Sequence, residues 1–97
     1  MSALDRFNLY LDECRLIAII RGITPDEVES IGQAIFDAGI RIIEVPLNSP
    51  QPLESIKRLS AKFGDLALVG GGTVLKPHQV SDVRASGGQI IVSPVLN

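Results

Sequence analysis

The chain has 97 residues, of which 45% are hydrophobic and 4% aromatic, a size and composition that suit one small domain with an aliphatic core. The formal net charge is −2 and the basic residues are scattered, so we expect no nucleic-acid partner. The single cysteine, Cys14, excludes an internal disulfide, and the sequence shows neither a leader peptide nor an apolar run of roughly 18 residues. These features predict a soluble, cytoplasmic protein that does not enter a membrane.

Helices and strands are predicted to alternate along the chain. A helix over about residues 4–13 comes first. Short runs rich in Ile and Val then predict strands at residues 16–20, 40–45, 66–69 and 89–93. The segments between the strands are amphipathic and predict three helices. Runs that are apolar throughout are typical of strands buried on both faces of a parallel sheet.

Proline and glycine mark the expected helix boundaries at intervals of about 25 residues. A proline occupies a predicted first helical position at Thr24-Pro25, Ser49-Pro50 and Lys76-Pro77. A glycine follows each of these helices as a predicted left-handed C-terminal cap, at Gly39, Gly64 and Gly87. Thr24 and Glu27 also fit a capping box, in which each side chain accepts a hydrogen bond from a backbone amide.

This order predicts the α/β class, with an N-terminal helix and about four parallel strands joined by three crossover helices. Four strands with three crossovers correspond to half of an eight-stranded (β/α)8 barrel, the TIM barrel. No linker divides the chain, so residues 1–97 are expected to form one unit, the N-terminal half of such a barrel. Because the sequence stops directly after the fourth strand, one sheet edge would be bare, and we expect a truncated chain.

The clearest chemical signal is Glu44, a carboxylate within the apolar strand 40–45. Arg21, Thr73 with the glycines before it, and Ser93-Pro94 come at the ends of the other three strands. The carboxyl ends of parallel strands meet at one edge of the sheet, where the active sites of such folds are built. The pattern therefore predicts a site for a small anionic carbonyl compound, with Glu44 as a proton shuttle.

Other interpretations of the same residues stay open. Arg21 and Glu44 can also form a buried ion pair with no further role, and the glycine run before Thr73 can be a simple loop. A metal-dependent lyase using Glu44 is disfavoured, because no cluster of His, Asp or Glu accompanies that residue. We therefore expect no metal site.

Segments near the ends of all the predicted strands are similar to one protein family. They read Ile-Ile-Arg-Gly-Ile at 19–23, Ile-Glu-Val-Pro-Leu-Asn-Ser-Pro at 43–50, Val-Gly-Gly-Gly-Thr-Val-Leu at 69–75 and Ile-Val-Ser-Pro at 91–94. In this order they closely resemble the bacterial 2-keto-3-deoxy-6-phosphonate aldolases. The Pro-Leu-Asn-Ser-Pro segment looks most like the branch that acts on 6-phosphogalactonate derivatives rather than the 6-phosphogluconate branch.

The resemblance implies a class I aldolase on a (β/α)8 barrel, a homotrimer when complete, that needs no metal or other cofactor. Such enzymes cleave a phosphorylated 2-keto-3-deoxy sugar acid to pyruvate and glyceraldehyde 3-phosphate through a lysine Schiff base. By position in the shared motifs, Glu44 would be the general acid and base. Arg21 and Thr73 would bind substrate, Thr73 near the pyruvate carboxylate, and Pro94 would shape the pocket floor.

The lysines depart from the family's pattern, in which the Schiff-base lysine lies on a later strand. The three lysines of this chain, Lys57, Lys62 and Lys76, fall on or just before predicted helices, so none is expected to enter the site. The leading hypothesis is therefore half of an aldolase that is inactive by itself. The alternative is a self-associating half barrel with a binding or structural role, in which two copies pair through their bare edges.

Overall fold

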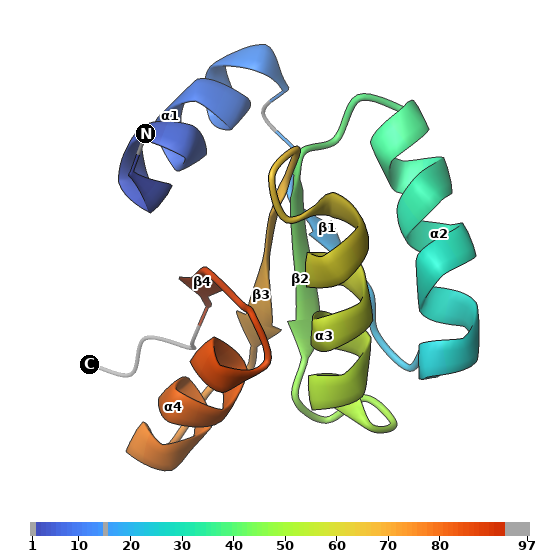
Figure 1. Cartoon of the computed structure of the whole chain (residues 1–97), viewed down its shortest axis with the longest axis vertical. Coiled ribbons are helices and arrows are strands. Elements are labelled where there is room, and N and C mark those ends of the chain that lie inside the picture. The colour runs from blue at the N-terminus through green and yellow to red at the C-terminus, as the bar shows by residue number, and fades with distance from the viewer. Residues whose placement is uncertain (1, 15, 93–97) are drawn as a thin grey trace.

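The computed structural model describes residues 2–14 and 16–92, which form four helices and a four-stranded parallel sheet (Figure 1). The helices are α1 (Ala3–Glu13), α2 (Pro25–Asp37), α3 (Pro52–Phe63) and α4 (Pro77–Ala85). The strands are β1 (Ala18–Ile19), β2 (Ile42–Pro46), β3 (Leu68–Gly72) and β4 (Ile90–Ile91). Each strand pairs with the next one along the chain. The predicted α/β class, with an N-terminal helix and parallel strands joined by three crossover helices, is confirmed.

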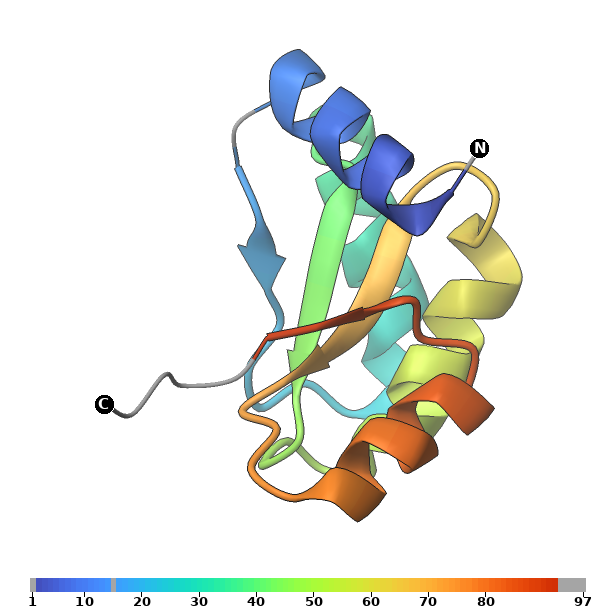
Figure 2. The same cartoon turned by 90° about the vertical axis from the view of Figure 1, so that its left-hand side faces the viewer.

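The two faces of the sheet are covered by different helices (Figures 1 and 2). On one face, Ile43, Val45 and Val69 belong to an aliphatic core with buried side chains of α2, α3 and α4. On the other face, α1 contacts β2 and β3 and lies across the ends at which these strands begin. We call this second face the inner face. Because strand side chains alternate, Ile42 and Glu44 of β2 point toward it.

Among the described residues, the side-chain hydrogen bonds that link α1 to the rest of the fold all come from Arg6. No residue of α1 is fully buried, so the helix contributes little to the core. The Arg6 guanidinium donates hydrogen bonds to Gln89 Oε1 at 2.6 Å, to the Gly64 carbonyl at 2.7 Å and to the Ala67 carbonyl at 2.9 Å. These three bonds join the first helix to the end of α3 and to the segments that lead into β3 and β4.

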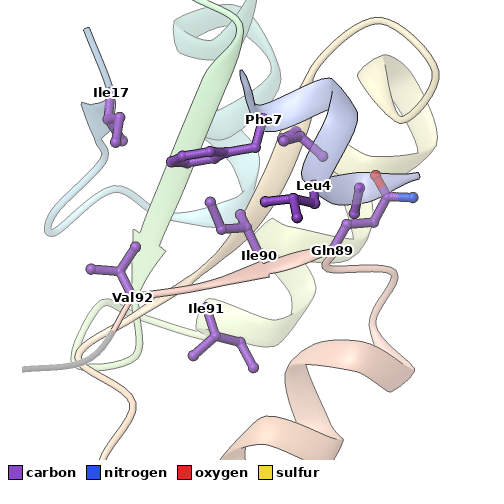
Figure 3. A pocket seen from close by; sticks show the side chains of 9 residues that line it. Leu4, Phe7, Ile17, Gln89, Ile90, Ile91 and Val92 are labelled. Atoms are coloured by element: carbon purple, nitrogen blue, oxygen red, sulfur yellow. The ribbon is translucent and has the colours of Figure 1, made fainter. Parts of the chain in front are cut away.

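Beside α1, the inner face carries exposed apolar side chains, among them Leu4 and Ile17. An apolar groove of about 590 Å³ lies there between α1, Ile17 and β4, and Figure 3 shows the side chains of the residues that line it. It is lined by Ala3, Leu4, Phe7, Ile17, Leu68, Gln89, Ile90, Ile91 and Val92. No helix among the described residues combines the length and apolar character that crossing a membrane requires.

The predicted helix starts are correct at Pro25 and Pro77, but the start predicted at Pro50 is wrong. Helix α3 begins at Pro52 rather than at Pro50, because the Ser49 hydroxyl bonds to the segment after β1 and does not cap the helix. The predicted capping box also differs in detail. The Thr24 side chain accepts no backbone hydrogen bond, and its hydroxyl instead donates to Glu27 Oε1 at 2.9 Å.

Two of the three predicted glycine caps are confirmed. Gly39 and Gly87 have φ of +95° and +96°, which places both in the left-handed region that glycine tolerates best. Gly64 has φ of −53°, so the prediction of a left-handed cap is wrong there. Its amide continues the helical pattern by donating to the Ser60 carbonyl at 2.8 Å.

The strand boundaries show where the glycine run belongs. Gly70, Gly71 and Gly72 are the last three residues of β3, not a loop that follows a strand. At Gly70, a side chain would collide with the backbone of Ile90, so glycine allows β4 to pair closely with β3. The edge strands β1 and β4 are shorter than predicted, with two residues each among those that the structure describes.

Candidate active site

Glu44 is a carboxylate held inside the sheet. It lies in the middle of β2, beside Ile19 of β1 and Gly70 of β3, and only 6% of the residue is exposed. Every residue of β2 is buried, so the surroundings of Glu44 are largely apolar. Because Ile43 and Val45 face the helices, the Glu44 side chain points to the inner face.

The space that the Glu44 carboxylate occupies is provided by Gly72. Any side chain at Gly72 would overlap the Glu44 carboxylate, because a Cβ built there meets Glu44 Oε1, Cδ and Cγ. Glu44 pairs in register with Gly70, so its side chain reaches along the sheet toward the carboxyl end of β3. The carboxylate therefore lies at the end of the sheet where parallel folds place their active sites.

Burial changes the acidity of this carboxyl group. The removal of water around the carboxylate raises the pKa of Glu44 above its ordinary value of 4.5, and the nearby positive charge of Arg21 lowers this pKa in part. Burial is the larger of the two effects. A carboxyl group with a raised pKa exchanges protons closer to neutral pH, as a general acid and base must.

Arg21 follows β1 on the inner face. Ile20 belongs to the core beneath the helices and its amide donates to the Glu44 carbonyl at 2.9 Å, so the next side chain along the chain points the opposite way. Arg21 is exposed, and no ion pair with Glu44 forms within the described ranges. The alternative of a buried Arg21–Glu44 ion pair is therefore wrong, and the guanidinium remains available to a ligand.

Thr73 stands at the same end of the sheet with a strained backbone. It directly follows β3, is half-buried, and has φ of +55°, which is unusual for a β-branched residue. The neighbouring peptide is held in place, because the Gly72 carbonyl accepts a hydrogen bond from the Leu47 amide at 2.9 Å. Residues kept in such conformations cluster at functional sites.

The structure thus brings Arg21, Glu44 and Thr73 to the carboxyl end of the sheet. Pro94 lies outside the described residues, so its predicted place in the pocket floor stays a prediction. All three lysines are exposed, with Lys57 and Lys62 on α3 and Lys76 at the start of α4. In residues 2–14 and 16–92, no group of three or more His, Cys, Asp or Glu is arranged to hold a metal ion.

Sequence reasoning missed two residues of this site. Gly72 gives the carboxylate its space, and Ser49 bonds to the backbone on both sides of Arg21. Ser49 looked like the start of a helix, and its true partners are 27 and 29 positions away along the chain. No local pattern signals such a pairing. The glycine run did carry a signal for Gly72, since glycine in a strand often marks a close approach.

Comparison with known proteins identifies the family. The sequence profile described as KDPG and KHG aldolase matches residues 8–97. The chain belongs to the KDPG and KHG aldolase family. It is 53% identical, over 84% of its length, to 2-dehydro-3-deoxy-6-phosphogalactonate aldolase from Escherichia coli K12, and this segment represents 40% of that protein.

Solved structures of aldolases from this family share the fold. A structure described as native KDPGal superimposes with a TM-score of 0.80 at 51% identity, covering 84% of this chain and 39% of the other. KDPG aldolase from Legionella pneumophila, which carries pyruvate captured as a covalent carbinolamine intermediate, has a TM-score of 0.71 at 31% identity over 84% of this chain and 40% of its own. The predicted resemblance and the barrel family of the fold are both confirmed, and the chain spans about 40% of the length of these aldolases.

Proposed function

We propose that this chain is the N-terminal half of a class I aldolase that cleaves a 2-keto-3-deoxy-6-phospho sugar acid to pyruvate and glyceraldehyde 3-phosphate. Family membership supports the reaction class. The observation that carries the proposal is the Glu44 carboxylate, which is buried on the inner face at the carboxyl end of the sheet with its pKa raised by burial. A proton shuttle for carbon–carbon cleavage requires such a group.

Each site residue has a role in this proposal. Glu44 moves protons while the carbinolamine forms and while the carbon–carbon bond breaks. Arg21 offers an exposed guanidinium to an anionic group of the substrate. Thr73 offers its hydroxyl and adjoining backbone near the pyruvate carboxylate, and Pro94 shapes the floor of the pocket. The proposed chemistry uses neither a metal nor another cofactor.

The nucleophile is proposed to come from another part of the complete protein. Lys57 and Lys62 are exposed on α3, which covers the face of the sheet opposite Glu44. The Legionella relative holds pyruvate as a covalent carbinolamine, the kind of intermediate that a lysine amine forms with a keto acid. We therefore expect the 97-residue chain to have no aldolase activity by itself.

The galactonate-type substrate is favoured over the gluconate type, because identity to the E. coli phosphogalactonate aldolase is 53% and identity to the Legionella KDPG aldolase is 31%.

We further propose a homotrimer for the complete enzyme and a cytoplasmic location. The resemblance of the site motifs to the family supports the first, and the naming of relatives as bacterial aldolases of sugar-acid derivatives supports the second.

The test is Glu44→Gln in the complete protein, with Glu29→Gln on the exposed side of α2 as a matched control. We expect kcat to fall by about 10²- to 10⁴-fold for Glu44→Gln, because the amide cannot exchange the proton, and to stay unchanged for the control. Steady-state kinetics of pyruvate release measures both. Turnover near that of the wild type in Glu44→Gln would sink the role proposed for Glu44.

A second candidate is a self-associating half barrel. It is favoured by the edges of β1 and β4, which pair with no further strand of the described residues, and by the apolar groove beside α1. A twofold axis along the barrel axis would pair β4 of each copy with β1 of the other while keeping all strands parallel. Size-exclusion chromatography with light scattering tests this candidate. A discrete dimer supports it, and a monomer or a polydisperse aggregate rules it out.

A further inference from the structure

Ser49 holds the backbone on both sides of Arg21. Its hydroxyl accepts a hydrogen bond from the Gly22 amide at 3.2 Å and donates to the Ile20 carbonyl at 3.5 Å. These two groups belong to the peptide units immediately before and after the Arg21 Cα atom. Ser49 is only 6% exposed, so water competes poorly for its hydroxyl.

Ser49 is in turn fixed relative to Glu44. Its own amide donates to the Pro46 carbonyl at 3.0 Å, in a turn that begins at the last residue of β2. Glu44 lies two residues earlier in the same strand, and its carbonyl accepts the Ile20 amide at 2.9 Å. A short, rigid path of backbone and one hydroxyl therefore connects the carboxylate residue to the arginine residue.

Arg21 depends on this path for its position. The regular pairing of β1 ends at Ile19, and the chain turns away at Gly22, which has φ of +74°. Arg21 is exposed, and its guanidinium forms no hydrogen bond with other residues that the structure describes. The peptide groups on its two sides are thus what determine where the side chain starts and in which direction it leaves.

We propose that Ser49 is a positioning residue, whose hydroxyl sets the separation between the Arg21 guanidinium and the Glu44 carboxylate by holding both peptide groups that flank Arg21. This role refines the proposed function, since it matters for catalysis only if Arg21 and Glu44 act on one substrate. The arrangement itself is a property of this chain and is measured without substrate.

The test is a titration of the Glu44 carboxyl carbon by ¹³C NMR in the 97-residue chain. Four proteins are compared, namely wild type, Arg21→Gln, Ser49→Ala and the double variant. Removing the Arg21 charge raises the pKa of Glu44, because that charge lowers it in the wild type. Ser49→Ala is expected to raise this pKa in the same direction by a smaller amount, and to add nothing when Arg21 is already Gln.

Ser55→Ala is the matched control. Ser55 is fully buried on α3, and its hydroxyl has no hydrogen-bond partner among the described residues, so its removal should leave the pKa of Glu44 unchanged. The proposal is overturned if Ser49→Ala leaves the Glu44 pKa at its wild-type value. It is equally overturned if Ser49→Ala shifts this pKa as much with Gln at position 21 as with Arg.

A measurement on the unmodified chain covers the case in which Ser49→Ala does not fold. Hydrogen exchange at the Gly22 amide should be slowed at least tenfold relative to an unstructured chain, although Gly22 is exposed, because the amide donates to a buried hydroxyl. Exchange at the unstructured rate would show that the Ser49 hydroxyl does not hold the peptide group after Arg21, and would overturn the proposal. Neither readout involves aldolase activity, so failure here is distinct from failure of Glu44→Gln in the complete enzyme.

Discussion

Glu44 and Gly72 form one unit at the residue scale. The carboxylate occupies the place where a side chain on the neighbouring strand would stand. A strand glycine normally weakens a sheet, because it has no side chain to pack and loses more backbone entropy on folding. Here the missing side chain lets a charged group lie within an otherwise apolar strand and still reach the carboxyl end of the sheet.

Gly72→Ala should therefore lower the free energy of unfolding by about 1–3 kcal/mol, since the added methyl group overlaps the Glu44 carboxylate. The same substitution should cost much less when Glu44 is already Ala, because the space is then empty. Urea denaturation of the wild type, both single variants and the double variant measures the coupling. An equal cost in both backgrounds would show that the carboxylate does not occupy this space.

Glu44 should also make stability depend on pH. Burial raises its pKa above 4.5, so the folded protein retains the proton to a higher pH than the unfolded chain does. As the pH rises from about 4.5 through the folded-state pKa, the free energy of unfolding should fall for the wild type relative to Glu44→Gln.

Urea denaturation of the wild type and of Glu44→Gln at a series of pH values measures this difference in the free energy of unfolding. Groups other than Glu44 contribute nearly equally to both proteins and cancel in the difference. A difference that is constant with pH would mean that the pKa of Glu44 is the same in the folded and unfolded states. A difference of opposite sign would mean that Arg21 outweighs burial.

At the scale of elements, α1 differs from the other helices in how it is held. The helices α2, α3 and α4 each place fully buried side chains against the sheet, whereas α1 places none. Its attachment depends on Arg6, which reaches two backbone carbonyls and one side-chain amide. Hydrogen bonds from a charged donor contribute more than neutral ones, so one residue can secure a helix here.

Arg6→Ala should free α1 from the sheet while the rest of the fold stays intact. We expect a loss of about 1.5–3 kcal/mol in local stability, as for hydrogen bonds made by a charged group. Hydrogen exchange followed by mass spectrometry should show faster exchange across residues 3–13 only. Lys57→Ala, which removes an exposed cation from α3, is the control and should leave the exchange of residues 3–13 unchanged. Unchanged protection of α1 in Arg6→Ala would contradict the role of Arg6.

At the scale of the whole molecule, the sheet formed by residues 16–92 has two edges without a neighbouring strand and an apolar groove between them. Ile19 in β1 is 58% exposed and Ile91 in β4 is 38% exposed, and Ile91 also lines the groove that Figure 3 shows. Unpaired strand edges with exposed apolar side chains are sites of association. We therefore expect the isolated chain to associate as its concentration rises.

Ile91→Lys should weaken this association by about tenfold or more, because burying an ammonium group in an apolar contact costs well over ~1.4 kcal/mol. Leu66→Lys is the control, since Leu66 is 56% exposed but lies outside the groove, in the segment before β3. Sedimentation equilibrium of the three proteins measures the association constants. Equal weakening by both substitutions would locate the contact elsewhere.

The sequence by itself determined the order of elements, the parallel sheet and the candidacy of Glu44, because hydrophobic period, proline and glycine act locally along the chain. The family followed from short motifs at strand ends. Only the tertiary structure decided that Gly72 makes room for the carboxylate, that Ser49 bonds across to the Arg21 backbone, and that Arg6 secures α1. Each of these joins residues that are far apart along the chain, and the distances between such residues are set by packing rather than by sequence spacing.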